Sequence, residues 1–261
     1  MTDNLRVSTV QSIIHWEDID ANLSHFSKQI KKLKNRTDVV ILPEMFTTGF
    51  SMQPARLAQS MTGKTMKWMV KQAKKINGVV AGSFIAKEDG KYYNRLIWMF
   101  PNGTFKTYDK RHLFTLAKED ENYEAGTKKL ILEWRGWRIC PLICYDLRFP
   151  VWARNVENYD LLIYTANWPV TRSGAWKTLL EARAIENQCY VVGVNRVGKD
   201  GSDLYYSGDS SVIDFGGKVL YRATDIENVT TVEISKTAMD AFRKKLNFLG
   251  DKDLFTISNE K

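Results

Sequence analysis

The chain has 261 residues, 44% of them hydrophobic, and carries 38 Lys and Arg against 30 Asp and Glu, a net charge of +8 at pH 7. This length and composition predict one α/β domain over residues 1–261 and exclude a disordered chain. The basic residues are scattered and form no stripe or known module, so we expect no nucleic-acid partner; the charge favours small anionic substrates.

No apolar run reaches the ~18 residues that cross a bilayer, and the first ten residues lack the apolar stretch of a signal peptide. The three cysteines, Cys140, Cys144 and Cys189, are widely spaced and predict neither a disulfide framework nor a CxxC metal site. We therefore expect a reduced, cytoplasmic protein with no membrane partner and no metal.

The first part of the chain predicts alternating strands and helices. Strands are expected over residues 5–11, 38–44 and 78–86, where apolar residues cluster. Helices are expected over residues 17–34 and 64–76, where apolar residues recur at a helical period.

The middle and end of the chain predict strands, hairpins and two more helices. Residues 92–100 and 104–110 flank Pro101-Asn102-Gly103, a strong hairpin signal. A polar, acidic loop follows over 112–126. The other predicted strands are 137–143, 160–166, 190–195 and 229–235, the helices are 150–158 and 175–188, and the late hairpin is 210–223. Together these features predict a layered α/β sandwich.

Cys144 lies where the apolar run WRICPLI ends and polar residues begin. A buried core cysteine is the simpler interpretation, and it suits Cys140 and Cys189. A helix is predicted soon after Cys144, however, and a strand-to-helix turn can present a nucleophile beside free backbone N–H groups. Both interpretations of Cys144 stay open at this point.

A thiol nucleophile needs a base, and three residues are candidates for the chemistry around it. His112 is one candidate, with a structural hydrogen-bonding role as its alternative. Glu44 ends the buried run VVILPE, and the apolar MFTTGF that follows would desolvate it and suit it to a general base. Lys110 closes TYDK in the same way, either as an oxyanion stabiliser or as a surface lysine. Strand ends on one edge of an open α/β sheet meet in one cleft, so these residues can converge.

Three segments resemble the signatures of the nitrilase, or carbon–nitrogen hydrolase, superfamily: ILPEMF, YDKRHLF and PLICYDLRFP. The correspondence runs over nearly the whole chain in the right order and spacing, and includes NWP, EARAIENQCYVVGVN and YSGDSSVIDFGG. LPEMFTTGF and KRHLF further resemble the omega-amidase branch, whose members hydrolyse the distal amide of 2-oxoglutaramate and related short ω-amides.

The resemblance implies a four-layer αββα sandwich and a catalytic triad without organic cofactor or metal. Glu44 would be the general base, Lys110 the stabiliser of the tetrahedral intermediate and Cys144 the nucleophile that forms a thioester. The backbone N–H of Tyr145 would complete the oxyanion hole with Lys110. A second glutamate is implied in the following loop, where Glu119 fits best.

Two points of the resemblance leave alternatives open. Glu121 is the rival of Glu119, because the acidic loop makes the correspondence ambiguous. Family members commonly form homodimers with crossing C-terminal segments. Residues 236–261 are therefore expected to form a C-terminal extension at a dimer interface, with the segment 242–255 crossing over; a surface helix with a loose end is the other interpretation.

The substrate is expected to be a short ω-amido acid, which needs a cation for its distant carboxylate. Arg148 is the candidate, unless it pairs with a nearby acid, and Arg172 also stands close in the sequence to the expected mouth of the pocket. Phe46 and Trp168 are candidate pocket walls, with core packing as the alternative. Other carbon–nitrogen hydrolases (an aliphatic amidase, an N-carbamoyl hydrolase, a nitrilase) would use the same triad, and a non-catalytic interaction module is the rival of another class.

Overall fold

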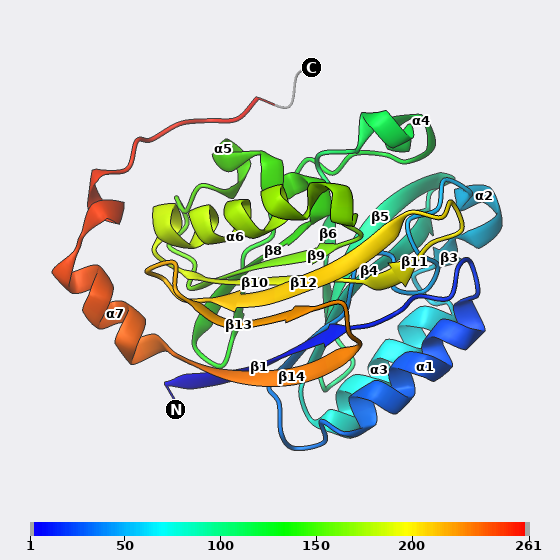
Figure 1. Cartoon of the computed structure of the whole chain (residues 1–261), viewed down its shortest axis with the longest axis horizontal. Helices are drawn as coiled ribbons and strands as arrows, with labels where there is room; N and C mark the ends of the chain where they lie inside the picture. Colours follow the sequence, from blue (N-terminus) through cyan, green and yellow to red (C-terminus); the bar gives the residue numbers. More distant parts are fainter. Residues whose placement is uncertain (1–2, 259–261) are drawn as a thin grey trace.

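Two mixed sheets pack face to face, and helices cover both outer faces, in a computed structural model that describes residues 3–258 (Figure 1). The layers run helix, sheet, sheet, helix. This arrangement confirms the αββα sandwich expected from the sequence.

The first sheet joins the two ends of the described chain. β1 pairs in parallel with β2 and antiparallel with β14, so that strands from both ends lie side by side. The order is β14-β1-β2-β4-β5-β6, with β3 beside β4. The strands are β1 Asn4–Gln11, β2 Val39–Ile41, β3 Gln59–Ser60, β4 Val79–Glu88, β5 Lys91–Met99, β6 Phe105–Asp109 and β14 Asn228–Ser235.

The second sheet has the order β11-β12-β10-β9-β8-β7, with β13 beside β12. Its centre, β8-β9-β10, is parallel, which directs the carboxyl ends of these strands to one edge. The strands are β7 Leu132–Trp134, β8 Trp137–Ile143, β9 Leu161–Ala166, β10 Tyr190–Asn195, β11 Val197–Lys199, β12 Tyr205–Ile213 and β13 Val219–Thr224.

Long helices form the outer layers, and short ones carry the loops of the site. The α-helices are α1 Ile19–Lys31, α2 Pro54–Leu57, α3 Lys64–Ile76, α4 Glu119–Asn122, α5 Pro150–Ala153, α6 Ser173–Asn187 and α7 Lys236–Lys245. The 3₁₀ turns are η1 Thr115–Ala117, η2 Cys144–Arg148, η3 Val170–Arg172 and η4 Phe248–Asp251.

Side-chain alternation along the strands builds the layers. Val39 and Ile41 of β2 face the other sheet, whereas Val40 between them faces the α1 and α3 layer. Leu161 of β9 likewise joins the core between the sheets, and Leu162 joins the core under α6. Strands buried on both faces explain why the sequence shows apolar runs rather than a polar alternation.

Several predicted boundaries differ from the observed ones for local reasons. The first helix starts later than residue 17, because the Asp18 side chain caps it by accepting the N–H of Ala21 at 2.9 Å. The helix predicted over 150–158 is a single turn, α5. The Asn155 side chain then accepts the N–H of Tyr159 at 2.8 Å and holds a loop instead.

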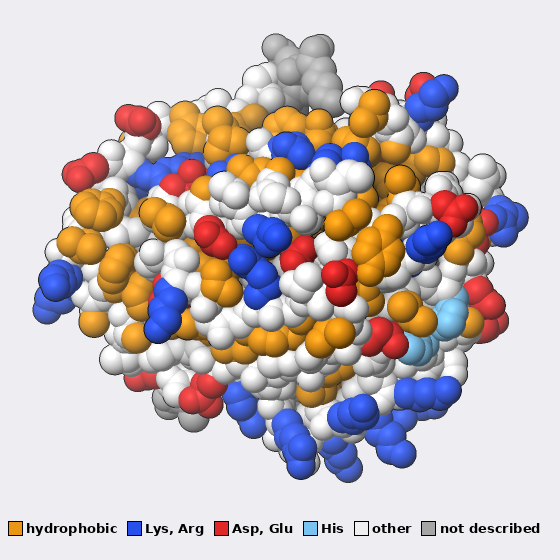
Figure 2. Space-filling view, in the orientation of Figure 1, with side chains coloured by type: hydrophobic (Ala, Val, Ile, Leu, Met, Phe, Trp, Pro, Cys, Tyr) orange, Lys and Arg blue, Asp and Glu red, His pale blue; other side chains and the backbone are white. Residues whose placement is uncertain are grey.

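The solvent faces of α1 and α3 carry a group of lysines, visible along the lower edge of Figure 2. Lys28 and Lys31 of α1 and Lys67, Lys71 and Lys74 of α3 are all exposed. Among residues 3–258, no helix is long and apolar enough to cross a membrane.

Within the described residues, the segment after α7 packs against the domain of the same molecule. Lys252 donates to the side chain of Asn158 at 2.8 Å, and Arg111 donates to the carbonyl of Ser258 at 3.2 Å. The segment runs as extended chain past the α5 side of the molecule (Figure 1). Residues 259–261 of the predicted extension lie outside the described part of the chain.

Candidate active site

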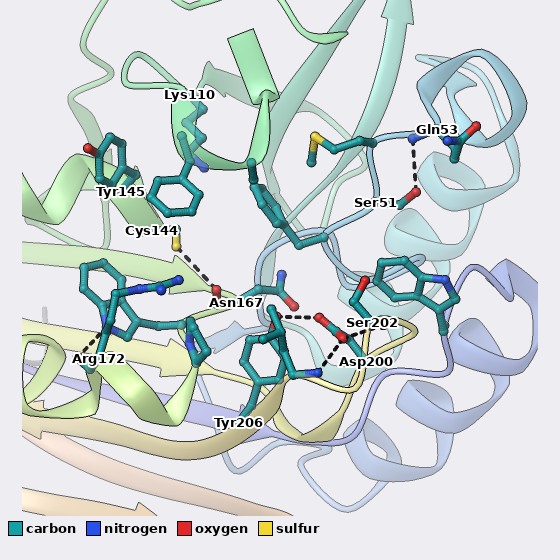
Figure 3. Close-up of a pocket in the computed structure, with 18 of the residues that line it drawn as sticks. Ser51, Gln53, Lys110, Cys144, Tyr145, Asn167, Arg172, Asp200, Ser202 and Tyr206 are labelled. Carbon is teal, nitrogen blue, oxygen red and sulfur yellow. Dashed lines mark hydrogen bonds between the residues drawn. The ribbon is translucent and has the colours of Figure 1, made fainter. Parts of the chain in front are cut away.

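Glu44, Lys110 and Cys144 meet at the ends of their strands. Glu44 follows β2, Lys110 follows β6, and Cys144 follows β8 as the first residue of η2. Lys110 Nζ donates to Glu44 Oε1 at 2.9 Å. Cys144 Sγ lies 3.9 Å from the carbonyl oxygen of Asn167, and the N–H of Asn167 donates to Glu44 Oε2 at 2.8 Å. Figure 3 shows Cys144, Lys110 and Asn167 around one cavity.

Glu119, rather than Glu121, belongs to this cluster. Both carboxylate oxygens of Glu119 accept from Lys110 Nζ, at 3.0 and 2.8 Å, and its Oε2 also accepts the N–H of Phe114 at 2.6 Å. Glu121 is exposed and lies 3.7 Å from Lys118. The geometry therefore separates two glutamates that the sequence left as rivals.

Hydrogen bonds hold the backbone of Lys110 as well as its side chain. Its N–H donates to the carbonyl of Asn94 at 3.0 Å, and its carbonyl accepts the N–H of Gly126 at 2.8 Å. A Cβ at Gly126 would lie 2.1 Å from the carbonyl oxygen of Asp109, so only glycine allows this approach. The Nζ also lies 5.1 Å from the centre of the Phe50 ring.

Burial and neighbouring charges set the protonation of the site. Burial alone would lower the pKa of Lys110, but the carboxylates of Glu119 and Glu44 outweigh it and the pKa is raised, so Lys110 stays a cation. Burial and then the charge of Glu44 raise the pKa of Cys144 well above its usual value, and Lys110 only partly opposes them. The resting thiol is therefore protonated and needs a base before it can attack.

Two asparagines that the sequence reasoning missed as site residues hold the carboxylates in place. Asn94 of β5 donates to Glu44 Oε1 at 2.8 Å and to Glu119 Oε1 at 3.1 Å. Asn167 donates its side-chain N–H₂ to the carbonyl of Glu44 at 2.6 Å, besides its backbone N–H to Oε2. Only the position of NWP after a strand end could have pointed to Asn167; Asn94 carries no such signal.

The turn that bears Cys144 is strained. Cys144 has a φ of +42°, a left-handed conformation that is unfavourable for a residue with a Cβ. Tyr145 follows in the first turn of η2, where backbone N–H groups have no acceptor within the helix. A residue in this conformation between a strand and a helical turn is the backbone feature of a nucleophile elbow.

His112 does not accompany the thiol. Its ring stacks on Phe149 with centroids 3.6 Å apart, and its Nδ1–H donates to Asp146 Oδ1 at 2.8 Å. Asp146 also accepts from the hydroxyl of Tyr108 at 2.7 Å and from the N–H of Ile143 at 3.0 Å. The structural interpretation of His112 therefore fits its contacts, and the general-base interpretation does not.

Beside Cys144 lies a cavity of about 380 Å³ with two guanidinium groups in its wall. Arg148 lies over the Trp168 ring, 4.9 Å from its centre, and Arg172 lies 5.3 Å from the centre of the Phe114 ring. Within residues 3–258, neither guanidinium has a carboxylate partner. The cavity is lined by Trp16, Glu17, Phe50, Ser51, Met52, Gln53, Lys110, Phe114, Ala117, Cys144, Tyr145, Arg148, Asn167, Trp168, Pro169, Arg172, Asp200, Ser202, Leu204 and Tyr206.

The structure corrects one expected pocket wall and agrees with the other. Trp168 lines the cavity. Phe46 instead packs against Phe26 and Trp68 in the core under α1 and α3. The preceding residue, Met45, has a φ of +42°, and the chain turns there toward the helices. Phe50, four residues further on, lines the cavity in its place.

Among the described residues, no group of three or more His, Cys, Asp or Glu is arranged to hold a metal ion. The cluster itself offers the thiol of Cys144, the carboxylates of Glu44 and Glu119, and the ammonium of Lys110. A thiol, a base and cationic or N–H donors at one cavity are the parts needed for acyl transfer through a covalent intermediate.

Comparisons with known proteins point the same way. The carbon–nitrogen hydrolase family model matches residues 6–244. An omega-amidase of Escherichia coli K12, YafV, is 46% identical over 257 residues, covering 97% of this chain and 98% of the relative. A 2-oxoglutaramate amidase of Bacillus subtilis strain 168 is 34% identical, covering 95% and 98%.

A solved structure agrees with both. XC1258 of Xanthomonas campestris, described as a CN-hydrolase superfamily protein with an arsenic adduct in its active site, superposes with a TM-score of 0.96. It is 43% identical and covers 98% of this chain and 99% of its own. The chain belongs to the carbon–nitrogen hydrolase family.

Proposed function

We propose that the protein is an omega-amidase, which hydrolyses the terminal amide of a short ω-amido acid such as 2-oxoglutaramate or succinamate to the acid and ammonia. The observation that carries the proposal is one buried cluster of Glu44, Lys110 and Cys144 beside a cavity whose wall holds two arginines without a carboxylate partner among the described residues. Relatives named omega-amidase and 2-oxoglutaramate amidase support the same choice.

In the acylation half, Glu44 accepts the thiol proton of Cys144 and the thiolate attacks the amide carbon. Lys110 Nζ and the N–H of Tyr145 stabilise the oxyanion, each donor contributing about 3–4 kcal/mol by the usual cost of losing one. The C–N bond then breaks, and the protonated Glu44 gives its proton to the leaving nitrogen. Ammonia departs and a thioester on Cys144 remains.

In the deacylation half, Glu44 accepts a proton from water, and the hydroxide attacks the thioester carbon. The same donors hold the second oxyanion. The C–S bond breaks, the proton returns from Glu44 to the sulfur, and the carboxylic acid is released. Glu119 takes no proton in this scheme; it fixes and balances Lys110. No organic cofactor or metal is invoked.

The substrate carboxylate is assigned to the cationic wall of the cavity. Arg148 and Arg172 each present guanidinium N–H groups that no protein carboxylate occupies within the described residues. A guanidinium binds a carboxylate through paired hydrogen bonds, while Trp168 forms an apolar wall beside it. A substrate with an amide at one end and a carboxylate at the other spans these two ends of the cavity.

We also propose a single catalytic unit over residues 1–261, cytoplasmic, that pairs into homodimers through residues 236–261. In support, Leu254 and Phe248 in this segment are strongly exposed apolar side chains, which a second copy would cover. Light scattering measures the molar mass of the full chain and of a variant truncated after residue 245. If both have the mass of a monomer, the proposal of a homodimer is wrong.

The test of the activity is ammonia release from a substrate panel: 2-oxoglutaramate, succinamate, glutamine, a neutral aliphatic amide, a nitrile and an N-carbamoyl amino acid. We expect selective turnover of the first two, and none by Cys144→Ala. Preference for another compound would keep the chemistry and assign the protein to another branch. Wild-type rates in Cys144→Ala would refute the mechanism.

The rival of another class, a non-catalytic interaction module, has a test of its own. Cys144 lies at the cavity with 8% of its surface exposed, whereas Cys140 and Cys189 are fully buried. Iodoacetamide is therefore expected to alkylate Cys144 first in the native protein. Equal labelling of the three thiols would favour the module.

A further inference from the structure

The amide of Asn94 occupies an unusual position between two carboxylates. Its Nδ2 donates to Glu44 Oε1 at 2.8 Å and to Glu119 Oε1 at 3.1 Å, and Lys110 Nζ donates to the same two oxygens at 2.9 and 3.0 Å. The four groups form a closed ring in which a cation and a neutral amide face each other across two anions.

The side-chain oxygen of Asn94, Oδ1, has no hydrogen-bond partner among the described residues, although it is buried. A buried amide that satisfies only one end is costly, and a residue chosen for packing would avoid that cost. The backbone carbonyl of Asn94 additionally accepts the N–H of Lys110 at 3.0 Å. Asn94 is therefore tied to Glu44, Lys110 and Glu119 alike, and its N–H₂ group is the part that the site uses.

We propose that Asn94 is a positioning residue for the proposed amide hydrolysis. Its N–H₂ group holds the carboxylates of Glu44 and Glu119 apart around the single positive charge of Lys110. Two buried carboxylates beside one ammonium carry an excess negative charge, and hydrogen bonds to the charged form offset it. Asn94 supplies these bonds without adding a second cation.

None of the titratable or charged groups named next takes over the hydrogen bonds that Asn94 donates to the two carboxylates. Tyr123 is a neutral phenol whose pKa is raised by burial and then by Glu119, and its hydroxyl donates to the carbonyl of Ser51. Glu17 pairs with Arg56. Arg95, next to Asn94 on β5, is engaged by Asp109 at 2.6 Å. Cys144 is protonated at rest and carries no charge to the ring.

The test compares two substitutions in the full-length enzyme. Asn94→Ala removes both donors and leaves a small cavity; Asn94→Asp keeps the shape but replaces the donors by a third carboxylate. We expect Asn94→Asp to lower kcat/KM more than Asn94→Ala, mainly through kcat. In Asn94→Ala the acid limb of the pH profile should move up by about one pH unit, since each carboxylate loses a donor that favours its charged form.

The alkylation rate of Cys144 by iodoacetamide against pH gives a second readout that needs no amide substrate. In Asn94→Ala, the acid limb of the alkylation profile should move in the same direction as the acid limb of the turnover profile. The turnover assay rests on the proposed function. If no substrate of the panel released ammonia but the alkylation profile still shifted, the omega-amidase assignment would be wrong and the role of Asn94 would stand.

Asn155→Ala is the matched control. Asn155 is another fully buried asparagine whose amide donates twice, to Tyr159 O at 2.9 Å and Asn187 O at 3.1 Å, away from the cavity. This variant should lose stability without moving either acid limb. The role of Asn94 is overturned if Asn94→Ala also lowers only the melting temperature, or if Asn94→Asp is the more active of the two variants.

Discussion

At the scale of single residues, the site depends on three buried ionisable side chains. The carboxylates of Glu44 and Glu119 share the one positive charge of Lys110. Lys110 is fully buried, and so are both of its glutamates. An ammonium without carboxylates would lose its proton in such surroundings, and a carboxylate without donors would gain one. The supporting glutamate is thus a condition for the base and the lysine to hold their roles.

Glu119→Gln should therefore lower kcat by roughly 100-fold, because Lys110 loses its two-oxygen partner and moves relative to the reacting carbon. Glu121→Gln, two residues along the same short helix, should leave kcat within twofold, since its ion pair with Lys118 is exposed. Ammonia release at saturating substrate measures both. Equal losses in the two variants would contradict the assignment.

The cationic wall gives a second prediction at this scale. Arg172→Gln should raise KM for succinamate by roughly tenfold to a hundredfold, the usual range for a lost hydrogen-bonded charge. Hydrolysis of a neutral amide of equal length should change little. Lys71→Gln removes one positive charge from the exposed face of α3 and serves as control. A matching KM rise in that control would indicate long-range attraction rather than direct binding.

These residues differ in how far the sequence reveals them. Glu44, Lys110 and Cys144 each follow an apolar run, and their types alone suggest chemistry. Asn94 lies inside the strand YYNRLIWMF, where nothing in the pattern shows that it faces the strand ends of Glu44 and Lys110. Phe46 is two residues from Glu44 and was a candidate pocket wall, with core packing as its alternative; the chain turns at Met45, whose φ is positive, and Phe46 packs in the core.

At the scale of elements, Asp146 links the ends of β6 and β8. It accepts from Tyr108 of β6, from His112 in the following loop and from Ile143 at the end of β8. Lys110 and Cys144 lie between these anchor points along the chain. The carboxylate thus fixes the separation of the two strand ends and holds the strained turn at Cys144.

His112→Asn tests whether His112 belongs to this framework or to the chemistry. Loss of its bond to Asp146 should lower the free energy of unfolding by about 1–3 kcal/mol, with kcat within about tenfold of wild type. Glu44→Gln should instead lose roughly a thousandfold in kcat, as expected for removal of a general base. Urea unfolding and ammonia release measure the two effects. A thousandfold loss in His112→Asn would reinstate it as the base.

Elements were predictable where one period dominates. The helix 64–76 and the strands 137–143 and 190–195 match α3, β8 and β10 to the residue. The helix predicted over 150–158 ends after the single turn α5, and the helix α4 within the acidic loop was not predicted, because side-chain caps and tertiary contacts, rather than periodicity, determine such short pieces. The pairing of β1 with β14 joins residues between 217 and 231 positions apart, and no local pattern reveals it.

At the scale of the whole molecule, the two sheets are joined by more than apolar packing. Asp38 lies just before β2 and accepts from Arg6 of β1 at 2.9 Å through the backbone and at 3.0 Å through the guanidinium. Arg135, from the β7–β8 hairpin of the other sheet, lies 3.2 Å from the same carboxylate. Trp134 beside it donates to the carbonyl of Asp38 at 3.3 Å. This corner couples the sheets electrostatically.

The charge of Asp38 makes that coupling depend on pH. Burial alone would raise the pKa of Asp38, but the hydrogen bonds from Arg6 and the charge of Arg135 outweigh it and the pKa is lowered. The folded protein then binds this proton more weakly than the unfolded chain does. The contribution to stability is complete above the ordinary aspartate pKa of about 3.9 and is lost as pH falls through the lower, folded-state value.

Asp38→Asn should consequently cost about 1–2 kcal/mol at pH 7, with the partly exposed arginines limiting the loss. The difference from wild type should narrow as pH falls below about 4, because protonation removes the same charge from the wild-type protein. Urea unfolding at a series of pH values measures it. Asp20→Asn breaks an exposed pair with Lys64 and should change stability by less than about 0.5 kcal/mol. Parallel pH profiles for wild type and Asp38→Asn would show that the sheets are held at this corner by packing alone.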